Sequence, residues 1–143
     1  MRSNLKSLLY LTFVLFLANC GTTNSHDQYL IEINNVTKNS CATGYEYKFS
    51  TLGNNVSIVC SNIYADPIVY TAALSDLYFS WNTLNVSDEE GPDHEIIIAC
   101  SQLGDSCLQS ESGGMSRITI EIKGEEGTQR LLSNLSYLKN LNE

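Results

Sequence analysis

Basic side chains and histidines are scarce in this sequence, which limits both its partners and its chemistry. Eight lysines and arginines stand against 16 aspartates and glutamates among 143 residues, giving a net charge of -8 and an isoelectric point of about 4.6. Such a chain cannot neutralise a run of phosphates, so nucleic acid is not expected as a partner. With two histidines and no catalytic motif, we expect no enzyme and no cofactor.

The sequence also lacks an apolar run of the roughly 20 residues that a membrane-spanning helix needs. Its N-terminal apolar stretch, Leu8 to Ala18, has about 11 residues and follows the basic Arg2 and Lys6. A basic start followed by a short apolar run is typical of a secretory signal. We therefore predict that residues 1–19 are a signal peptide.

This run ends in Leu17-Ala18-Asn19-Cys20-Gly21, which resembles the lipobox of bacterial lipoproteins. Leu17, Ala18 and Cys20 match the pattern, whereas Asn19 stands where Gly, Ala or Ser is usual. The resemblance implies cleavage before Cys20 and a diacylglycerol on its thiol, which anchors a protein without placing any segment in the bilayer. In a host with two membranes it implies the outer one, because Gly21 is not the retaining aspartate.

Residues 29–143 predict a single β-rich domain, joined to the membrane by the lipidated Cys20 and a polar tether over residues 20–28. Removing residues 1–19 takes away two bases and no acid, which brings the net charge to -10. Alternating apolar residues indicate strands with one buried face. Seven or eight strands are predicted: Tyr29–Val36, Tyr45–Phe49, Val56–Cys60, Ile68–Thr71, Leu77–Trp81, Thr83–Val86, Ile96–Cys100 and Ile118–Ile122. Turns are predicted at Gly53-Asn54-Asn55, Asp66-Pro67, Gly91-Pro92-Asp93, Gly104-Asp105 and Gly113-Gly114.

The end of the chain follows a helical pattern instead. Leu131, Leu135, Leu138 and Leu141 recur at three- and four-residue steps and predict an amphipathic helix over residues 125–141. Its leucine stripe needs an apolar partner surface. We expect that surface to be an inner sheet face that includes Tyr47, Ile58, Phe79, Ile98 and Ile120.

A bent antiparallel sheet or barrel with one C-terminal helix resembles the pleckstrin-homology-like superfold. Residues 75–141 also resemble small bacterial domains of unassigned role, with an aromatic strand, a cysteine hairpin and a leucine-rich helix. Familiar pleckstrin-homology domains bind phosphoinositides through a basic cluster, but the early loops here offer only Lys38 and Lys48. The resemblance therefore does not imply headgroup binding.

The alternative fold is an immunoglobulin-like β-sandwich. Cys60, Trp81 and Cys100 occur in the cysteine–tryptophan–cysteine order of that fold. Their spacing and the terminal helix are foreign to it, so we favour the bent sheet.

The cysteines predict disulfides rather than a metal site. Assigning Cys20 to lipid leaves Cys41, Cys60, Cys100 and Cys107, and four cysteines can pair in three ways. Local loop closure favours Cys41 with Cys60 and Cys100 with Cys107. No CxxC pair and no nearby histidine supports zinc.

One acidic segment is the candidate for metal-dependent chemistry, and it makes a small metal-dependent hydrolase the alternative function. Its spacing is not that of a calcium loop, so we interpret it as a solvated turn, with His94 and His26 as exposed polar residues. The segment contains Asp88, Glu89, Glu90, Asp93, His94 and Glu95.

Together these patterns predict an envelope lipoprotein whose domain is a noncatalytic binding or interaction module, with an unidentified protein partner possible. A secreted eukaryotic or viral glycoprotein is a further alternative, because four strings have the form of N-glycosylation acceptors. They begin at Asn35, Asn55, Asn85 and Asn134, and their number is close to what composition gives by chance.

Overall fold

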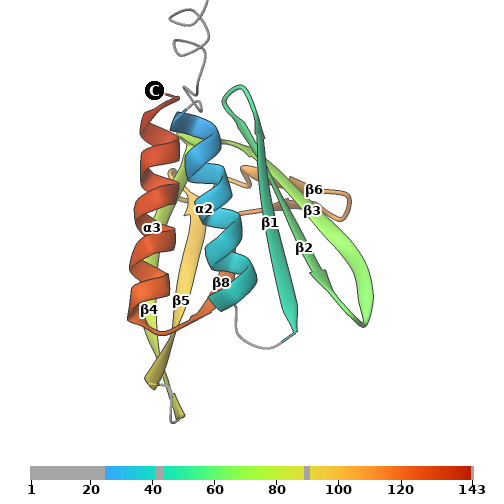
Figure 1. The fold of residues 1–143 in the computed structure, drawn as a ribbon. Helices are drawn as coiled ribbons and strands as arrows, with labels where there is room; N and C mark the ends of the chain where they lie inside the picture. The colour runs from blue at the N-terminus through green and yellow to red at the C-terminus, as the bar shows by residue number, and fades with distance from the viewer. Residues whose placement is uncertain (1–24, 41–43, 89–90, 143) are drawn as a thin grey trace, which may run out of the picture.

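A computed structural model describes residues 25–40, 44–88 and 91–142 (Figure 1). The predicted signal peptide, Cys20 and Cys41 lie outside the described residues. The elements are α2 (Ser25–Ser40), β1 (Tyr45–Leu52), β2 (Asn55–Asn62), β3 (Ala65–Ala73), the short 3-10 helix η1 (Leu74–Asp76), β4 (Leu77–Asp88), β5 (Gly91–Cys100), β6 (Leu108–Ser110), β7 (Gly113–Met115), β8 (Arg117–Lys123) and α3 (Glu125–Asn140). The predicted mainly β fold with a C-terminal helix is confirmed.

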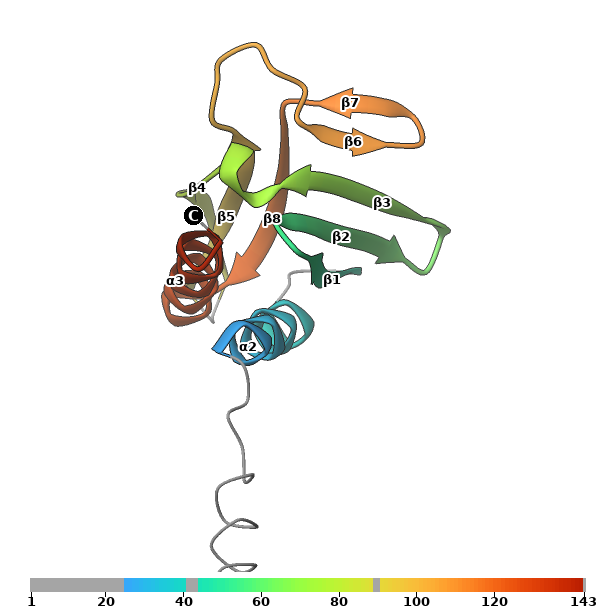
Figure 2. The same cartoon turned by 90° about the horizontal axis from the view of Figure 1, so that it is seen from above.

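The strands form two antiparallel sheets that do not close into a barrel. One sheet has the order β1-β2-β3-β6-β7 and the other β4-β5-β8. Figure 2 shows α2 and α3 side by side next to the three-stranded sheet, with the five-stranded sheet extending away from them. The chain therefore has one helix-covered sheet and one sheet that is covered over only part of its face.

The core lies between the helices and the sheets, as the leucine stripe predicts. Leu131, Leu135 and Leu138 of α3 are at most 1% exposed. Of the expected inner-face residues, Ile58, Ile98 and Ile120 are fully buried, whereas Tyr47 and Phe79 are half-buried at the margin of the core. Leu141 follows the last helical residue and is 49% exposed, so the predicted stripe ends at Leu138.

The first predicted strand is wrong: residues 29–36 belong to α2. Ile33, Val36 and Thr37 are buried on one face of this helix. They are three and four residues apart, which is the spacing of one helix face. Ile and Val favour strands, but packing of α2 along α3 and β1 overrides that preference. The last residues of the predicted tether, 25–28, also belong to α2, which begins at Ser25.

Several strand boundaries differ from the prediction as well. β4 is one continuous strand that includes the predicted Thr83–Val86, and Gly91-Pro92 opens β5 instead of forming a turn. Asp66-Pro67 lies inside β3, and the chain reverses at Ile63-Tyr64. Pro67 is tolerated there because β3 pairs with β6 only at Thr71, so its earlier residues lie on a sheet edge.

The hairpin of β6 and β7 was missed, since each strand has three residues and Gly113-Gly114 suggested a turn. Gly114 instead lies within β7 against the preceding loop. A Cβ added to it would stand 2.9 Å from the Cβ of Ser106. The glycine is therefore needed for close approach of two backbones.

The structure bears out one of the two favoured disulfides. Cys100 and Cys107 are bonded, with their Cα atoms 5.7 Å apart. Cys60 forms no disulfide with a described cysteine, and its predicted partner Cys41 lies outside the described residues. The immunoglobulin-like alternative would need Cys60 bonded to Cys100, so the observed pairing removes its main support.

Candidate functional site: a cleft between the two sheets

The inner face of the five-stranded sheet continues past the core and forms one wall of a cleft. On β1, β2 and β3 the residues of this face alternate, and those nearest the helices are buried. Phe49 and Ile58, for example, pair in the core. Farther along the same strands the face is open, and it contributes Tyr45, Tyr47, Cys60, Ile68 and Tyr70 to the cleft.

The opposite wall comes from β8 and its neighbours. Ile120 and Ile122 point into the core, so the alternate residues of β8 face the other way. The cleft has a volume of about 470 Å³, within the range of roughly 300–1,000 Å³ that small ligands use. This wall is formed by Met115, Arg117, Ile118, Thr119 and Glu121, with Glu95 from β5.

A hydrogen bond joins the two walls. The hydroxyl of Tyr47 donates to the carbonyl oxygen of Thr119 at 3.2 Å. The strands that carry these residues belong to different sheets. The bond therefore sets the separation of the walls where they approach each other.

α2 holds β1 in position through its side chains. Asn34 accepts a hydrogen bond from the amide of Phe49 (2.7 Å) and donates one to its carbonyl oxygen (2.9 Å). Thr37 donates to the carbonyl oxygen of Tyr47 at 2.8 Å. β1 is an edge strand, and these side chains supply the hydrogen bonds that a neighbouring strand would make. α2 therefore supports the cleft wall formed by β1, β2 and β3, which we call the tyrosine wall.

The charged side chains of the cleft are two glutamates and one arginine. Glu95 and Glu121 face each other directly across the β5–β8 pair. Like charges in such positions repel, so this arrangement is costly unless a positive charge lies nearby. Arg117 lies on the same face of β8, four residues from Glu121 along the strand.

Tyr70 and Cys60 lie on neighbouring strands of the tyrosine wall. Burial raises the pKa of the Tyr70 hydroxyl above the usual 10.0, and the nearby charge of the Cys60 thiolate raises it further. The hydroxyl is therefore a neutral hydrogen-bond donor and acceptor throughout the physiological pH range.

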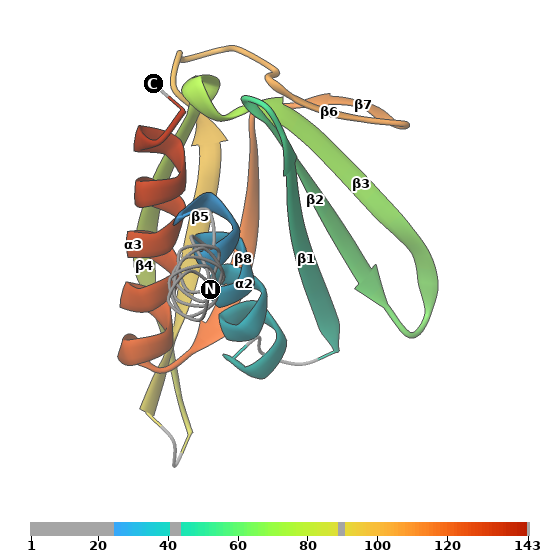
Figure 3. The same cartoon turned by 45° about the horizontal axis from the view of Figure 1, so that its top comes forward.

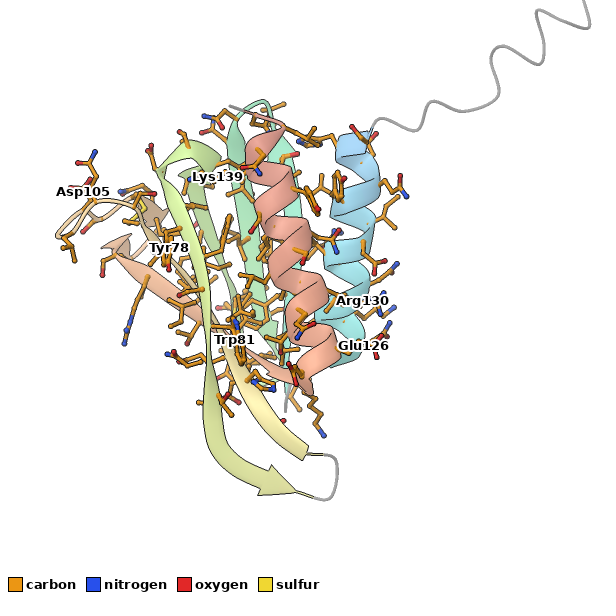
Figure 4. The ribbon with its side chains drawn as sticks, turned by 90° about the vertical axis from the view of Figure 1, so that its left-hand side faces the viewer. Tyr78, Trp81, Asp105, Glu126, Arg130 and Lys139 are labelled. Atoms are coloured by element: carbon orange, nitrogen blue, oxygen red, sulfur yellow. A yellow bond between two sulfur atoms is a disulfide. The ribbon has the colours of Figure 1, made fainter. Side chains whose placement is uncertain are left out.

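His94 is not the exposed polar residue that the sequence predicted. It lies on β5 and is 3% exposed, on the same core-facing side as Ile96 and Ile98. Its ring meets that of Trp81 edge to face, with centroids 5.0 Å apart, and neither ring nitrogen has a hydrogen-bond partner among the described residues. Figure 4 shows Trp81 on β4 at the level of the first turn of α3, the turn that carries Glu126. The period-two spacing of His94, Ile96 and Ile98 is the sequence signal for this burial.

The rest of the acidic segment is divided between strands. Asp88 ends β4, Asp93 and Glu95 lie on β5, and Glu89 and Glu90 lie outside the described residues. Only Glu95 lines the cleft. In the described ranges, no three histidine, cysteine or acidic side chains gather as a metal site, and no helix is long and apolar enough to cross a membrane. His26 is half-buried, with Nε2 3.3 Å from the hydroxyl of Thr51.

Comparison of the chain with models of known protein families, with curated proteins and with solved structures gives no match. The pleckstrin-homology-like and lipoprotein resemblances therefore stay predictions.

Of the cleft residues, the sequence patterns predict Tyr47 on the inner face, Glu95 in the acidic segment and Cys60 as a disulfide cysteine, but they do not single out Arg117 or Glu121. The alternation of Tyr45 and Tyr47 indicated a shared face, and Arg117 and Glu121 alternate with buried isoleucines. No local pattern states which two faces meet in space. The cleft becomes visible only when the sheets are placed against each other.

Proposed function

We propose that this protein is an envelope lipoprotein, anchored by acyl chains on Cys20, whose domain binds a ligand without transforming it. The observation that carries the binding role is the cleft between the sheets, where three tyrosines face a charged wall. Tyrosine supplies apolar contact area and a hydroxyl while losing little conformational freedom on binding. Gly21 makes the outer membrane the expected location in a host with two membranes.

The chemistry of the cleft favours a ligand with positive charge and some apolar surface, such as a basic peptide segment. Glu95 and Glu121 stand opposite each other and repel, so a cation between them is attracted by both. Arg117 offers one compensating positive charge on the same face. The net charge of -10 that remains after removal of residues 1–19 acts in the same direction over longer distances.

Calorimetric titration tests the binding role. The probes are an acetylated and amidated Lys-Leu-Lys-Leu peptide and the corresponding Glu-Leu-Glu-Leu peptide. We expect saturable binding of the basic probe alone. Glu121→Gln should weaken it by roughly two- to fivefold, the effect of one exposed ion pair. Tyr45→Ser should weaken it too, whereas the matched Tyr64→Ser, at the exposed Ile63-Tyr64 turn outside the cleft, should not.

Equal binding of both peptides, or equal loss in the Tyr45 and Tyr64 variants, would contradict this assignment of the cleft. The anchor is tested separately by the intact mass of the protein extracted from membranes. We expect a chain that begins at Cys20 and carries acyl mass. A Cys20→Ala protein that remains on the membrane would exclude the lipid anchor.

A further inference from the structure

Five chain segments lie toward the end of the domain where α2 begins, which we call the helix-start end, with the loop between β5 and β6 on the side of this end away from α2 (Figure 2). They are the start of α2, the β1–β2 turn, η1, the loop between β5 and β6, and the end of α3 (Figures 1 and 3). Hydrogen bonds tie them into one surface. The contacts are His26 Nε2 with Thr51 Oγ1 (3.3 Å), Leu74 N to Asn54 O (2.7 Å), Ser101 N to Asp76 O (2.8 Å) and Lys139 Nζ to Leu77 O (2.9 Å).

Three leucines from three of these segments stand exposed at this end. Leu52 is 85% exposed beside the β1–β2 turn, Leu103 is fully exposed in the loop after β5, and Leu141 is 49% exposed after α3. An exposed leucine is ordinary when it stands alone. These three share the end from which the chain leads back to Cys20.

The sequence leaves little distance between that end and a lipidated Cys20. Four residues separate Cys20 from Ser25, the first residue of α2. Even fully extended, this segment spans at most about 18 Å. A bilayer that holds the acyl chains therefore lies close to the start of α2.

We propose that the helix-start end rests on the lipid surface and that Leu52, Leu103 and Leu141 contact the bilayer. This inference rests on the proposed lipid anchor. It assigns the leucines to lipid because the anchor brings a bilayer within reach of this end of the domain. Four of the described apolar side chains are more than 80% exposed: Leu52 and Leu103 lie toward the helix-start end, and Ile63 and Tyr64 lie at the far turn of β2 and β3.

The helix-start end is negatively charged, so its contact with lipid is expected to be apolar and not electrostatic. Of the residues that the structure describes there, Asp27, Asp76 and Asp105 are exposed and acidic, and Lys139 is basic and half-buried. Figure 4 shows Asp105 and Lys139 toward the same end as the start of α2. Anionic headgroups would be repelled by this surface, so docking should be as good on neutral lipid as on anionic lipid.

This orientation leaves the binding cleft on the aqueous side. Tyr45 begins β1 and Leu52 ends it, so the tyrosine wall and the leucine contact lie at opposite ends of the same strand. A domain that sits on its helix-start end presents the cleft to dissolved ligands or to other proteins.

Quenching by brominated lipid tests the contact in the full acylated protein, reconstituted into phosphatidylcholine vesicles with bromine on the acyl chains. The parent protein has one tryptophan, Trp81, which gives the baseline. Leu52→Trp and Leu103→Trp variants should show at least twofold more quenching of the added fluorescence than the matched Tyr64→Trp control. Replacing a third of the lipid with phosphatidylglycerol should not increase it.

The outcomes separate this inference from the anchor. Acylated, vesicle-bound protein whose tryptophans at positions 52 and 103 are quenched no more than that at position 64 overturns the docking while the anchor stands. Quenching that appears only with phosphatidylglycerol also overturns it, since the contact would then be electrostatic. Absence of acyl mass on Cys20 overturns the anchor and this orientation with it.

Discussion

The hydroxyl of Tyr47 on β1 donates a hydrogen bond to the carbonyl oxygen of Thr119 on β8, 3.2 Å away, and so joins two sheets that share no strand pairing. We expect Tyr47→Phe to lower the free energy of unfolding by about 0.5–1.5 kcal/mol, the net value of one hydrogen bond. Urea denaturation measures this change. The same substitution at the exposed Tyr64 is the control and should leave the midpoint unchanged; an equal loss at both sites would argue against the cross-sheet bond.

Asn34 forms hydrogen bonds to the edge of β1, so its loss should destabilise the tyrosine wall. Asn34→Ala removes both hydrogen bonds to Phe49 and leaves that strand edge unpaired. We expect a loss of about 1–3 kcal/mol in unfolding free energy and a greater tendency to aggregate. Asn35→Ala changes the exposed neighbouring position and should be nearly neutral in the same denaturation and light-scattering measurements.

The packing of α3 predicts a large difference between adjacent positions. Leu135 is 1% exposed, so Leu135→Ala should cost roughly 2–5 kcal/mol, much of the stability of a small domain. Ser136→Ala removes only a hydroxyl that bonds within the helix, to the carbonyl oxygen of Leu132, and should have a small effect. Deleting residues 125–143 should expose the core and cause aggregation. A truncated protein that stays soluble and unfolds cooperatively would show that α3 is dispensable.

Tyr70 should make stability fall at alkaline pH. Burial, and then the Cys60 thiolate, raise the pKa of Tyr70 above 10.0 in the folded protein. Folding therefore holds its proton more tightly, so this contribution is complete below pH 10 and is lost as pH rises through the folded pKa. Absorbance titration at about 295 nm should reveal a late-ionising tyrosine that Tyr70→Phe removes.

A Cys60→Ser variant tests whether Cys60 contributes to the raised pKa of Tyr70. It should lower the Tyr70 pKa without bringing it to 10.0, because burial is the larger cause. A late-ionising tyrosine that Tyr70→Phe leaves in place would show that Tyr70 is not the shifted group, and a titration unchanged by Cys60→Ser would show that Cys60 does not act on Tyr70.

The sequence predicts the core better than it predicts the site. Regular alternation places Ile58, Ile98 and Ile120 inside, and the leucine spacing locates α3 within one residue of its end. α2 is missed because its apolar residues fit both periods and its β-branched residues favour strands. Its helical state depends on packing along α3 and β1.

The cleft is harder to predict because its residues obey the same alternation as the core. Tyr70 and Ile58 lie on one face and pair across adjacent strands, yet Tyr70 lines the cleft and Ile58 is buried. The difference depends on where the helices stop covering the sheet, which is a tertiary property. His94 is the opposite example. Its two-residue spacing from Ile96 predicts burial, whereas its polarity predicts exposure, and it is buried.

The central claim is that ligands bind between the two sheets, and amide chemical-shift mapping tests it most directly. On titration with the basic Lys-Leu-Lys-Leu peptide, the largest shifts should fall on Tyr45, Tyr70, Arg117 and Glu121, and in Glu121→Gln they should need a roughly two- to fivefold higher peptide concentration to saturate. Shifts concentrated at the Ile63-Tyr64 turn or along the exposed face of α3, with the cleft residues unmoved, would contradict the account.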